Sequence, residues 1–264
     1  MPYQDIILEK EGGVAILTLN RPDRLNALNA NIMAEMASAV TEVDEDDDMK
    51  ALIVTGAGRG FCSGADLIPT IGGERVMPGR KLRLEPLSGL GRIARVLAST
   101  DKPTIAAVNG VAAGAGFSIA VACDIRIASE NARFSAIFVR RALVPDTGIT
   151  YFLPRIVGIS KAVELCITGD IIDAMEAERI GLVSKVVPYD DLMREVKEYA
   201  ARIAKGPSVT IELAKRAVYK GLESDLASAL AYETWAYNVV LQTEDVQEGR
   251  RSFVEKREPV FKGR

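Results

Sequence analysis

Two glycine-rich segments are places where the backbone itself could do chemistry. They run from Gly56 to Gly64 and from Gly110 to Gly116. Neither fits the GxGxxG pattern of a dinucleotide site or the GxxxxGKS/T pattern of a phosphate loop. Such segments can present N–H groups to a developing negative charge, and a helix that begins near Gly114 would point its positive end at the same place. Close packing of small residues explains the glycines equally well at this stage.

The side chains available for acid–base chemistry are restricted, because the chain of 264 residues contains no histidine. Ser-His-Asp and Cys-His catalysis are excluded, as is nearly every zinc or non-haem iron site, so no metal is expected. Proton transfer must fall to Asp, Glu, Lys, Tyr or Cys. The three cysteines, Cys62, Cys123 and Cys166, are odd in number and far apart, which argues against a secreted disulfide framework.

Composition and charge are typical of a globular protein. Apolar residues make up 48% and charged residues 26%, and the net charge is −3, so nothing favours nucleic acid or an anionic membrane as a partner. The N-terminus shows no signal pattern, and a cytoplasmic location is expected. Residues 104–123 carry no charge, but Asn109 and three glycines interrupt them. A strand, a loop and a buried helix are therefore favoured over a membrane span.

Apolar periodicity places the two glycine-rich segments between strands and helices. Residues 6–19 predict a β-hairpin, and Asn29 is expected to cap a helix that ends near Glu45. Short apolar strands at residues 51–55 and 104–108 each lead into a glycine-rich segment. This alternation predicts an α/β fold. Residues 68–85, rich in Gly, Pro and Arg, are expected to form a surface loop.

After Pro188 the pattern is almost entirely helical. Four helices are predicted, at residues 192–205, 209–222, 225–241 and 244–256. The third carries an apolar face with the single tryptophan, Trp235. Residues 1–200 are therefore assigned to a core and residues 201–264 to a helical region that serves packing or assembly.

Several motifs occur in a fixed order along the chain. They include Phe61-Cys-Ser-Gly-Ala-Asp66, the run from Ile105 to Gly116 followed by Cys123-Asp124, Thr168-Gly-Asp and Phe253-Val-Glu-Lys-Arg257. Together they resemble the enoyl-CoA hydratase/isomerase, or crotonase, superfamily, and the resemblance spans essentially the whole chain. It implies a crotonase-like spiral of ββα units that binds acyl-CoA, with a C-terminal helical trimerisation region. A homotrimer or homohexamer is the implied assembly.

The resemblance also implies a substrate and the residues that bind it. The substrate would be an acyl-CoA thioester, with coenzyme A as part of it and no separate cofactor. The thioester oxygen would accept hydrogen bonds from the backbone N–H groups of Ser63 and Ala115, each worth ~3 kcal/mol to an enolate-like transition state. For Asp66 a cap that fixes its loop is favoured over catalysis. The implied substrate-binding residues are Arg24, Ala27, Ala65, Asp66, Leu67, Gly114, Phe138 and Pro145.

Two positions depart from the family pattern. True hydratases place one glutamate just after the second glycine-rich segment and another about twenty residues on, and these positions hold Ser118 and Phe138 here. The remaining candidate is Asp146, in Leu143-Val-Pro-Asp-Thr-Gly148. Family branches with an aspartate there include enoyl-CoA isomerases and the 4-chlorobenzoyl-CoA dehalogenase, which also needs a histidine. One carboxylate suffices to move a double bond, so isomerisation with Asp146 as the base is the leading prediction.

Other interpretations of Asp146 stay open. Water could be added to a 2-enoyl- or cyclic dienoyl-CoA through Asp146 with the hydroxyl of Ser118 or Thr147. The chain could also be a non-catalytic acyl-CoA binder, or Asp146 a structural turn residue after Pro145. Apolar neighbours at Leu143, Val144 and Ile149 would strengthen it as a base. The acyl group is not specified, although Phe134, Phe138, Ile71 and the loop at residues 68–85 are candidates for shaping its pocket.

Overall fold

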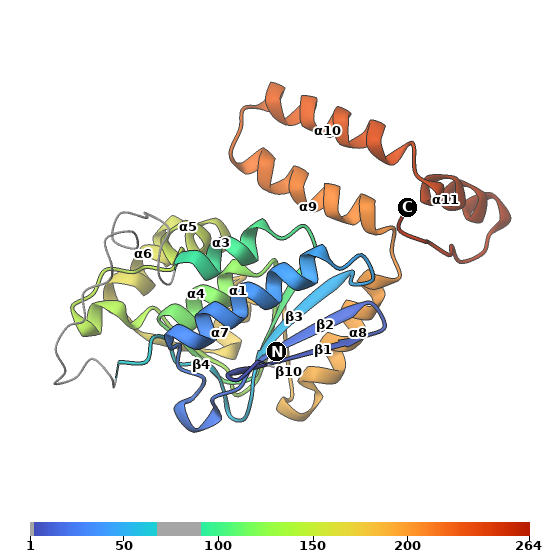
Figure 1. The fold of residues 1–264 in the computed structure, drawn as a ribbon. Helices are drawn as coiled ribbons and strands as arrows, with labels where there is room; N and C mark the ends of the chain where they lie inside the picture. Colours follow the sequence, from blue (N-terminus) through green and yellow to red (C-terminus); the bar gives the residue numbers. More distant parts are fainter. Residues whose placement is uncertain (1–2, 68–90) are drawn as a thin grey trace, which may run out of the picture.

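The computed structural model describes residues 3–67 and 91–264, which form two sheets with helices around them (Figure 1). The larger sheet has the strand order β1-β2-β3-β5-β7-β10 and the smaller one β4-β6-β8-β9. The strands of the larger sheet are β1 (Ile6–Glu11), β2 (Val14–Leu19), β3 (Ala51–Gly56), β5 (Thr104–Val108), β7 (Ile125–Ser129) and β10 (Lys185–Val187). Those of the smaller sheet are β4 (Gly60–Cys62), β6 (Val111–Ala113), β8 (Arg133–Ser135) and β9 (Ile171–Asp173).

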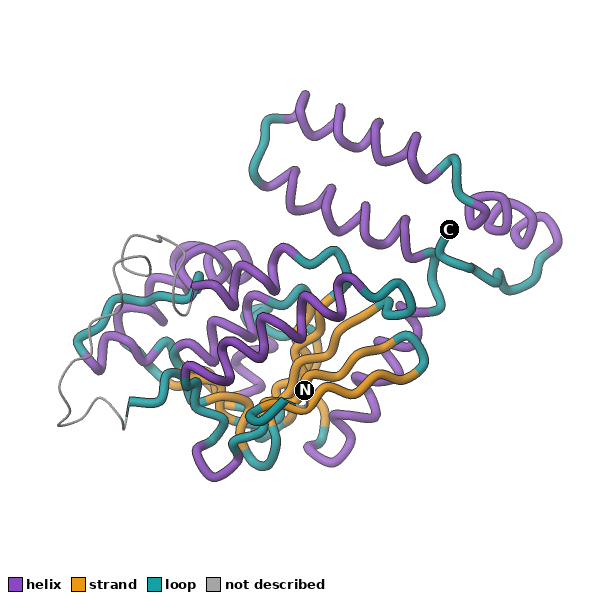
Figure 2. Tube along the Cα trace, viewed as in Figure 1, coloured by secondary structure: helices purple, strands orange, loops and turns teal. Residues whose placement is uncertain are grey.

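The helices follow the strand pairs along the chain (Figure 2). They are α1 (Ala30–Glu45), α3 (Gly91–Ser99), α4 (Ala115–Ala122), α5 (Ile149–Val157), α6 (Ile159–Thr168), α7 (Ala174–Arg179), α8 (Leu192–Ala204), α9 (Ser208–Leu222), α10 (Leu226–Val240) and α11 (Glu244–Glu255). Short 3-10 turns lie at η1 (Pro22–Arg24), η3 (Ile137–Arg141) and η4 (Tyr189–Asp191).

Successive strand pairs divide between the two sheets in a regular way. In the pairs β3 and β4, β5 and β6, and β7 and β8, the first strand joins the larger sheet and the second joins the smaller one. Neighbouring units pair in parallel in both sheets. Each pair is followed by helical structure, which confirms the predicted α/β spiral of ββα units.

The inner strands β2, β3 and β5 of the larger sheet are buried on both faces, which is why they read as continuous apolar runs. In β3, Leu52 and Val54 pack into the core shared with α1, α3 and α4, whereas Ala51 and Ile53 face α8. The face toward α8 is completed by Val196 and Ala200 of that helix. Alternate side chains of one strand therefore point to opposite faces of the sheet and pack into two separate cores.

The N-terminal elements match the sequence-based expectations. The hairpin of β1 and β2 pairs Ile6 with Leu19 and Glu11 with Val14. Asn29 caps α1 by accepting a hydrogen bond from the Ile32 N–H at 2.7 Å, as expected. The predicted loop at residues 68–85 lies outside the described residues, so its predicted role has no structural test.

The C-terminal helices α9 and α10 form a hairpin that projects from the body of the molecule, with α11 beside it (Figure 1). The predicted boundary at residue 200 falls inside α8, whose Ala200 is buried against the larger sheet. The break instead lies at residues 205–207, because Gly206 and Pro207 separate α8 from α9. Helix α8 therefore belongs with the core.

A polar cluster fixes α9 to the core. The Asp124 carboxylate, just before β7, accepts a hydrogen bond from the Tyr219 hydroxyl at 2.8 Å and forms an ion pair with Lys215 at 2.7 Å. Thr104 donates to the same carboxylate through its N–H at 2.7 Å and its hydroxyl at 2.9 Å. The Cys123-Asp124 motif thus joins β5, β7 and α9. In the part of the chain that the structure describes, no helix is long and apolar enough to cross a membrane.

Candidate active site

The chemistry predicted from the sequence converges on a cavity of about 160 Å³ beside the start of α4. Three segments surround it: the residues after β4, the first turn of α4, and the stretch from η3 to Asp146. The described residues that line it are Ser63, Gly64, Ala65, Leu67, Gly114, Ala115, Ile137, Phe138, Arg141, Leu143 and Asp146. Both glycine-rich segments and the aspartate turn therefore meet at one place.

Arg24, Ala27, Asp66 and Pro145 were predicted to bind substrate but do not line this cavity. Arg24 lies exposed in η1, and Ala27 is buried. The Asp66 carboxylate forms an ion pair with Arg21 at 2.9 Å, and the same guanidinium donates to the Ala27 carbonyl. This pairing supports the interpretation of Asp66 as a residue that fixes its loop.

The start of α4 is pressed against the end of β4, and this close approach requires a glycine in the first turn of the helix. A Cβ atom on Gly116 would lie 2.1 Å from the Cys62 carbonyl oxygen, so only glycine fits there. Gly114, the N-cap, has φ +53°, a region that favours glycine. Ala115 is the first residue of the helix, and its N–H has no acceptor among the described residues. It can therefore donate to an oxygen in the cavity.

The second predicted donor, the Ser63 N–H, is already in use. It donates to the Leu25 carbonyl at 3.0 Å, so the expected pair of free amides is not present in this structure. Leu25 and Asn26 both have left-handed backbone angles, with φ +49° and +56°, and this fold-back brings the Leu25 carbonyl to the end of β4. A thioester oxygen at Ser63 must share this N–H or displace that carbonyl.

The neighbouring thiol is not a nucleophile. Cys62 is fully buried, and burial raises the pKa of its thiol to about 12. Its Sγ donates to the Asn26 carbonyl at 3.1 Å. The thiol is therefore protonated near neutral pH, and acid–base work at this cavity falls to another group.

Asp146 lies in a strained turn at the edge of the cavity. Its side chain is exposed and accepts a hydrogen bond from the Thr147 hydroxyl at 2.7 Å. Thr147 and Gly148 have φ +57° and +81°, and this left-handed pair directs the chain into α5. The Ser118 hydroxyl lies within hydrogen-bond distance of the Asp146 carbonyl, at 3.2 Å, which ties the turn to α4.

The expected apolar surroundings of Asp146 are only partly formed. Ile149 is buried, but Leu143 and Val144 are 53% and 82% exposed. Their side chains point away from the core because the stretch between η3 and α5 runs along the surface. Within the described residues, no group of three or more His, Cys, Asp or Glu side chains converges to hold a metal ion.

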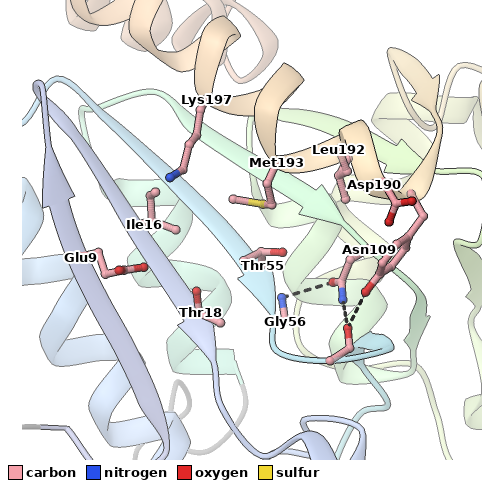
Figure 3. Close-up of a pocket in the computed structure, with 12 residues that line it drawn as sticks. Glu9, Ile16, Thr18, Thr55, Gly56, Asn109, Asp190, Leu192, Met193 and Lys197 are labelled. Carbon is pink, nitrogen blue, oxygen red and sulfur yellow. Dashed lines mark hydrogen bonds between the residues drawn. The ribbon is translucent and has the colours of Figure 1, made fainter.

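A larger cavity, of about 450 Å³, lies between α8 and the strands β1, β2 and β3 (Figure 3). Some of its polar groups bond to one another: Asn109 accepts from the Gly56 N–H at 3.3 Å and donates to the Gly58 carbonyl at 2.8 Å. The Tyr189 hydroxyl donates to the same carbonyl at 3.1 Å. None of the residues predicted to act on a substrate lines this cavity, so the smaller cavity is the candidate active site.

Comparison with known proteins decides the family. The family model for enoyl-CoA hydratase/isomerase matches residues 9–264. The chain belongs to the enoyl-CoA hydratase/isomerase family. It is similar to the short-chain-enoyl-CoA hydratase of Clostridium acetobutylicum, with 43% identity over 259 residues and 97% of each chain covered. The crotonyl-CoA hydratase of Syntrophomonas wolfei is 41% identical over 263 residues, with 99% of each chain covered.

A solved structure of the same family has the same fold. The crystal structure of enoyl-CoA hydratase from Bacillus anthracis is 36% identical and superposes with a TM-score of 0.92, covering 99% of this chain and 100% of that chain. The resemblance inferred from the ordered motifs is thus confirmed, and so is the crotonase-like fold.

The two positions that hold glutamates in hydratases of this family take on other roles here. Ser118 is fully buried, does not line the cavity, and has the Gly114 and Asp146 carbonyls as its hydroxyl's acceptors, at 3.3 and 3.2 Å. Phe138 does line the cavity and presents an apolar ring. The Ser118 hydroxyl is therefore in place to position the Asp146 turn rather than to activate a water.

Sequence reasoning missed two arginines. Arg21 lies between Asn20 and Pro22, and only the folded chain shows that it binds Asp66 and the Ala27 carbonyl. Arg141 lines the cavity but belongs to none of the quoted motifs. Its position depends on how η3 turns, and no local pattern reports that.

Proposed function

We propose that this enzyme of the enoyl-CoA hydratase/isomerase family moves a proton on an enoyl-CoA thioester, with Asp146 as the base. One observation carries the proposal: Asp146 supplies the single carboxylate among the described residues that line the cavity. A degenerate acyl-CoA binder has no need of a carboxylate beside a thioester. Coenzyme A would run along the segment from Ala65 to Leu67, with Arg24 and Ala27 near its path, and it enters as part of the substrate.

Isomerisation is the reaction that one carboxylate can complete. With a 3-enoyl-CoA, Asp146 takes a proton from C2, and the electron pair moves onto the thioester oxygen as a dienolate forms. The Ala115 N–H stabilises that oxygen at the positive end of α4. The protonated Asp146 then returns the proton to C4, and the double bond moves to C2–C3. Atoms and charge balance without water or a cofactor.

Hydration is the second candidate, and the names of similar proteins favour it. The relatives from Clostridium acetobutylicum and Syntrophomonas wolfei are named hydratases. In this version Asp146 would take a proton from water as the water adds to C3, and a second proton donor would serve C2. Support for Thr147 as part of such a relay is the hydrogen bond that its hydroxyl donates to the Asp146 carboxylate, although Thr147 itself is buried and does not line the cavity.

The two candidates differ in the product that they form. The purified protein should be given 3-hexenoyl-CoA and 2-hexenoyl-CoA separately, with products followed by mass spectrometry and by absorbance of the conjugated thioester. Isomerisation gives a conjugated product of unchanged mass from the first substrate. Hydration of the second substrate without isomerisation of the first would promote the alternative. Turnover of neither substrate, with tight binding of both, would identify a non-catalytic binder.

We also propose that the protein assembles as a homotrimer or homohexamer. Support comes from α10, which packs against α9 and leaves large apolar side chains in solvent. Leu226, Leu230 and Tyr237 are 75%, 52% and 62% exposed, and Trp235 is 48% exposed. An apolar face of this kind on a projecting hairpin suits burial against another copy of the chain.

A further inference from the structure

Arg141 is a charged residue at the candidate active site that the proposed chemistry does not use. It ends the η3 turn and lines the same cavity as Asp146 and Ala115. Apart from Arg141 and Asp146, the described lining consists of apolar side chains, glycines and Ser63. Arg141 is thus the cationic residue of the described lining, and it is exposed to solvent.

The adjacent residue, Arg140, has the contacts expected of an arginine with a structural role in this turn. Arg140 forms an ion pair with Asp170 at 2.7 Å and donates to the Thr168 carbonyl at 3.4 Å, which joins η3 to the end of α6. Within the described residues, Arg141 makes one hydrogen bond, from Nη1 to the Arg140 carbonyl at 3.3 Å. No ion pair joins it to a carboxylate of the described residues, Asp146 included. Arg141 therefore has most of its donors available for a ligand.

A neutral acyl chain offers no hydrogen-bond acceptor to the Arg141 guanidinium. A ligand that fills the cavity displaces water from the guanidinium, and that loss costs free energy unless the ligand supplies an acceptor. A carboxylate is the acceptor that matches the guanidinium fork, because two parallel N–H donors can bind its two oxygens.

We propose that Arg141 selects enoyl-CoA thioesters whose acyl chain ends in a carboxylate. The inference rests on the proposed function, since it names the acyl group that the same cavity accepts. The phosphates of coenzyme A are the other source of negative charge on such a substrate. The acyl carboxylate is favoured because Arg141 lies on the η3 side of the cavity with Phe138 and Asp146, whereas the predicted path of coenzyme A follows Ala65 to Leu67.

The test compares ligands that differ only at the end of the acyl chain. Binding of hexanoyl-CoA and adipoyl-CoA, which cannot react, and turnover of 3-hexenoyl-CoA and 3-hexenedioyl-CoA should be measured for the wild type. The same measurements follow for Arg141→Met and for the matched control Arg140→Met. The wild type is expected to favour the carboxylate ligand of each pair roughly 10- to 100-fold. Arg141→Met should abolish that preference because the carboxylate ligand of each pair loses more than the neutral one, while Arg140→Met should keep it.

Each outcome separates the inference from the proposed function. Equal affinity of the wild type for both ligands of a pair overturns the inference, even if 3-hexenoyl-CoA is isomerised. If Arg141→Met loses affinity equally for both ligands of a pair, the inference is also overturned, because that result assigns Arg141 to the phosphates of coenzyme A. A preference in binding with no turnover of either enoyl-CoA leaves the selection by Arg141 standing and rejects the proposed reaction.

Discussion

At the scale of single residues, the site depends on how the exposed stretch around Asp146 is held in place. Asp146 is exposed, so packing around its side chain does not hold it. Its position comes instead from the backbone: Ser118 bonds the Asp146 carbonyl, and Thr147 and Gly148 adopt left-handed angles. A serine at a position where hydratases carry a glutamate thus gains a positioning role.

Ser118→Ala should reduce kcat more than the loss of an equally buried serine hydroxyl far from the cavity does. The substitution removes the hydroxyl that joins α4 to the Asp146 turn, so the carboxylate samples more positions. Loss of one hydrogen bond should cost about 0.5 to 1.5 kcal/mol of unfolding free energy. Ser129→Ala is the matched control, because Ser129 is equally buried and its hydroxyl donates to the Asn109 carbonyl at 2.9 Å, away from the cavity. Comparable losses of both stability and kcat in the two variants would contradict the positioning role.

The sequence predicted which residues lie at this site better than it predicted their hydrogen bonds and their exposure. The motif residues Ser63, Ala115 and Asp146 line one cavity in the structure. They could not show that the Ser63 N–H is bonded to Leu25, because that contact depends on two left-handed residues far from β4 in sequence. The exposure of Leu143 and Val144 was missed for a similar reason: an apolar flank looks alike in sequence whether it is buried or exposed.

At the scale of elements, the contact between α4 and β4 fixes the distance across the cavity. Gly116→Ala would place a Cβ atom 2.1 Å from the Cys62 carbonyl oxygen, so the helix must move away from the strand. We expect the free energy of unfolding to fall by at least about 1 to 3 kcal/mol and turnover to be lost.

The matched control for this substitution is Gly221→Ala in α9. A Cβ atom on Gly221 would meet no atom within 4 Å, and the residue is helical. This change should stabilise the protein by about 0.5 to 1 kcal/mol and leave turnover unaffected. Urea unfolding at equal protein concentration compares the variants, and a Gly116→Ala protein as stable as the wild type would refute the close contact.

The anchor between α9 and the core should give a distinctive pH dependence. Burial, followed by the charge and hydrogen bonding of Asp124, raises the pKa of Tyr219 above the usual value of a tyrosine. The folded state therefore favours the protonated phenol. Its contribution to stability is fully present below about pH 10, where unfolded tyrosine titrates, and is lost as the pH rises through the higher folded value.

Tyr219→Phe isolates this contribution. The wild type should exceed the variant in unfolding free energy by roughly 1 to 3 kcal/mol at pH 7 to 9, since the hydrogen bond has a charged acceptor. The difference should shrink above about pH 10. Melting temperatures measured across this range provide the check, and a difference that stays constant or grows at high pH would contradict the assigned shift.

At the scale of the whole molecule, most of the fold could be predicted because its signals are local. Strands buried on both faces read as continuous apolar runs, and the α1 cap and the Gly206-Pro207 break are sequence features. The division of strand pairs between two sheets is not a local property, and the family resemblance supplied it. The domain boundary was misplaced because the helical pattern of α8 does not reveal that its inner face packs on the larger sheet.

The exposed apolar side chains of α10 predict that the whole molecule is an oligomer. Light scattering at micromolar concentration should give three or six times the chain mass of 28.5 kDa. Covering a large apolar side chain contributes about 1.5 to 3 kcal/mol, so Leu230→Asp should weaken the assembly. A wild-type protein that scatters as a monomer at this concentration would refute the assembly and leave the exposed face of α10 unexplained.

Asp146→Asn tests the central claim most directly. The amide keeps the shape of the side chain but cannot accept the substrate proton, so kcat should fall about 10²- to 10⁴-fold. The affinity for a saturated acyl-CoA should stay near the wild-type value, because the amide keeps the shape of the cavity and the proposed path of coenzyme A follows Ala65 to Leu67. The measurement is kcat for 3-hexenoyl-CoA, with hexanoyl-CoA binding determined on the same preparations. Turnover by Asp146→Asn close to the wild-type rate would show that another group moves the proton.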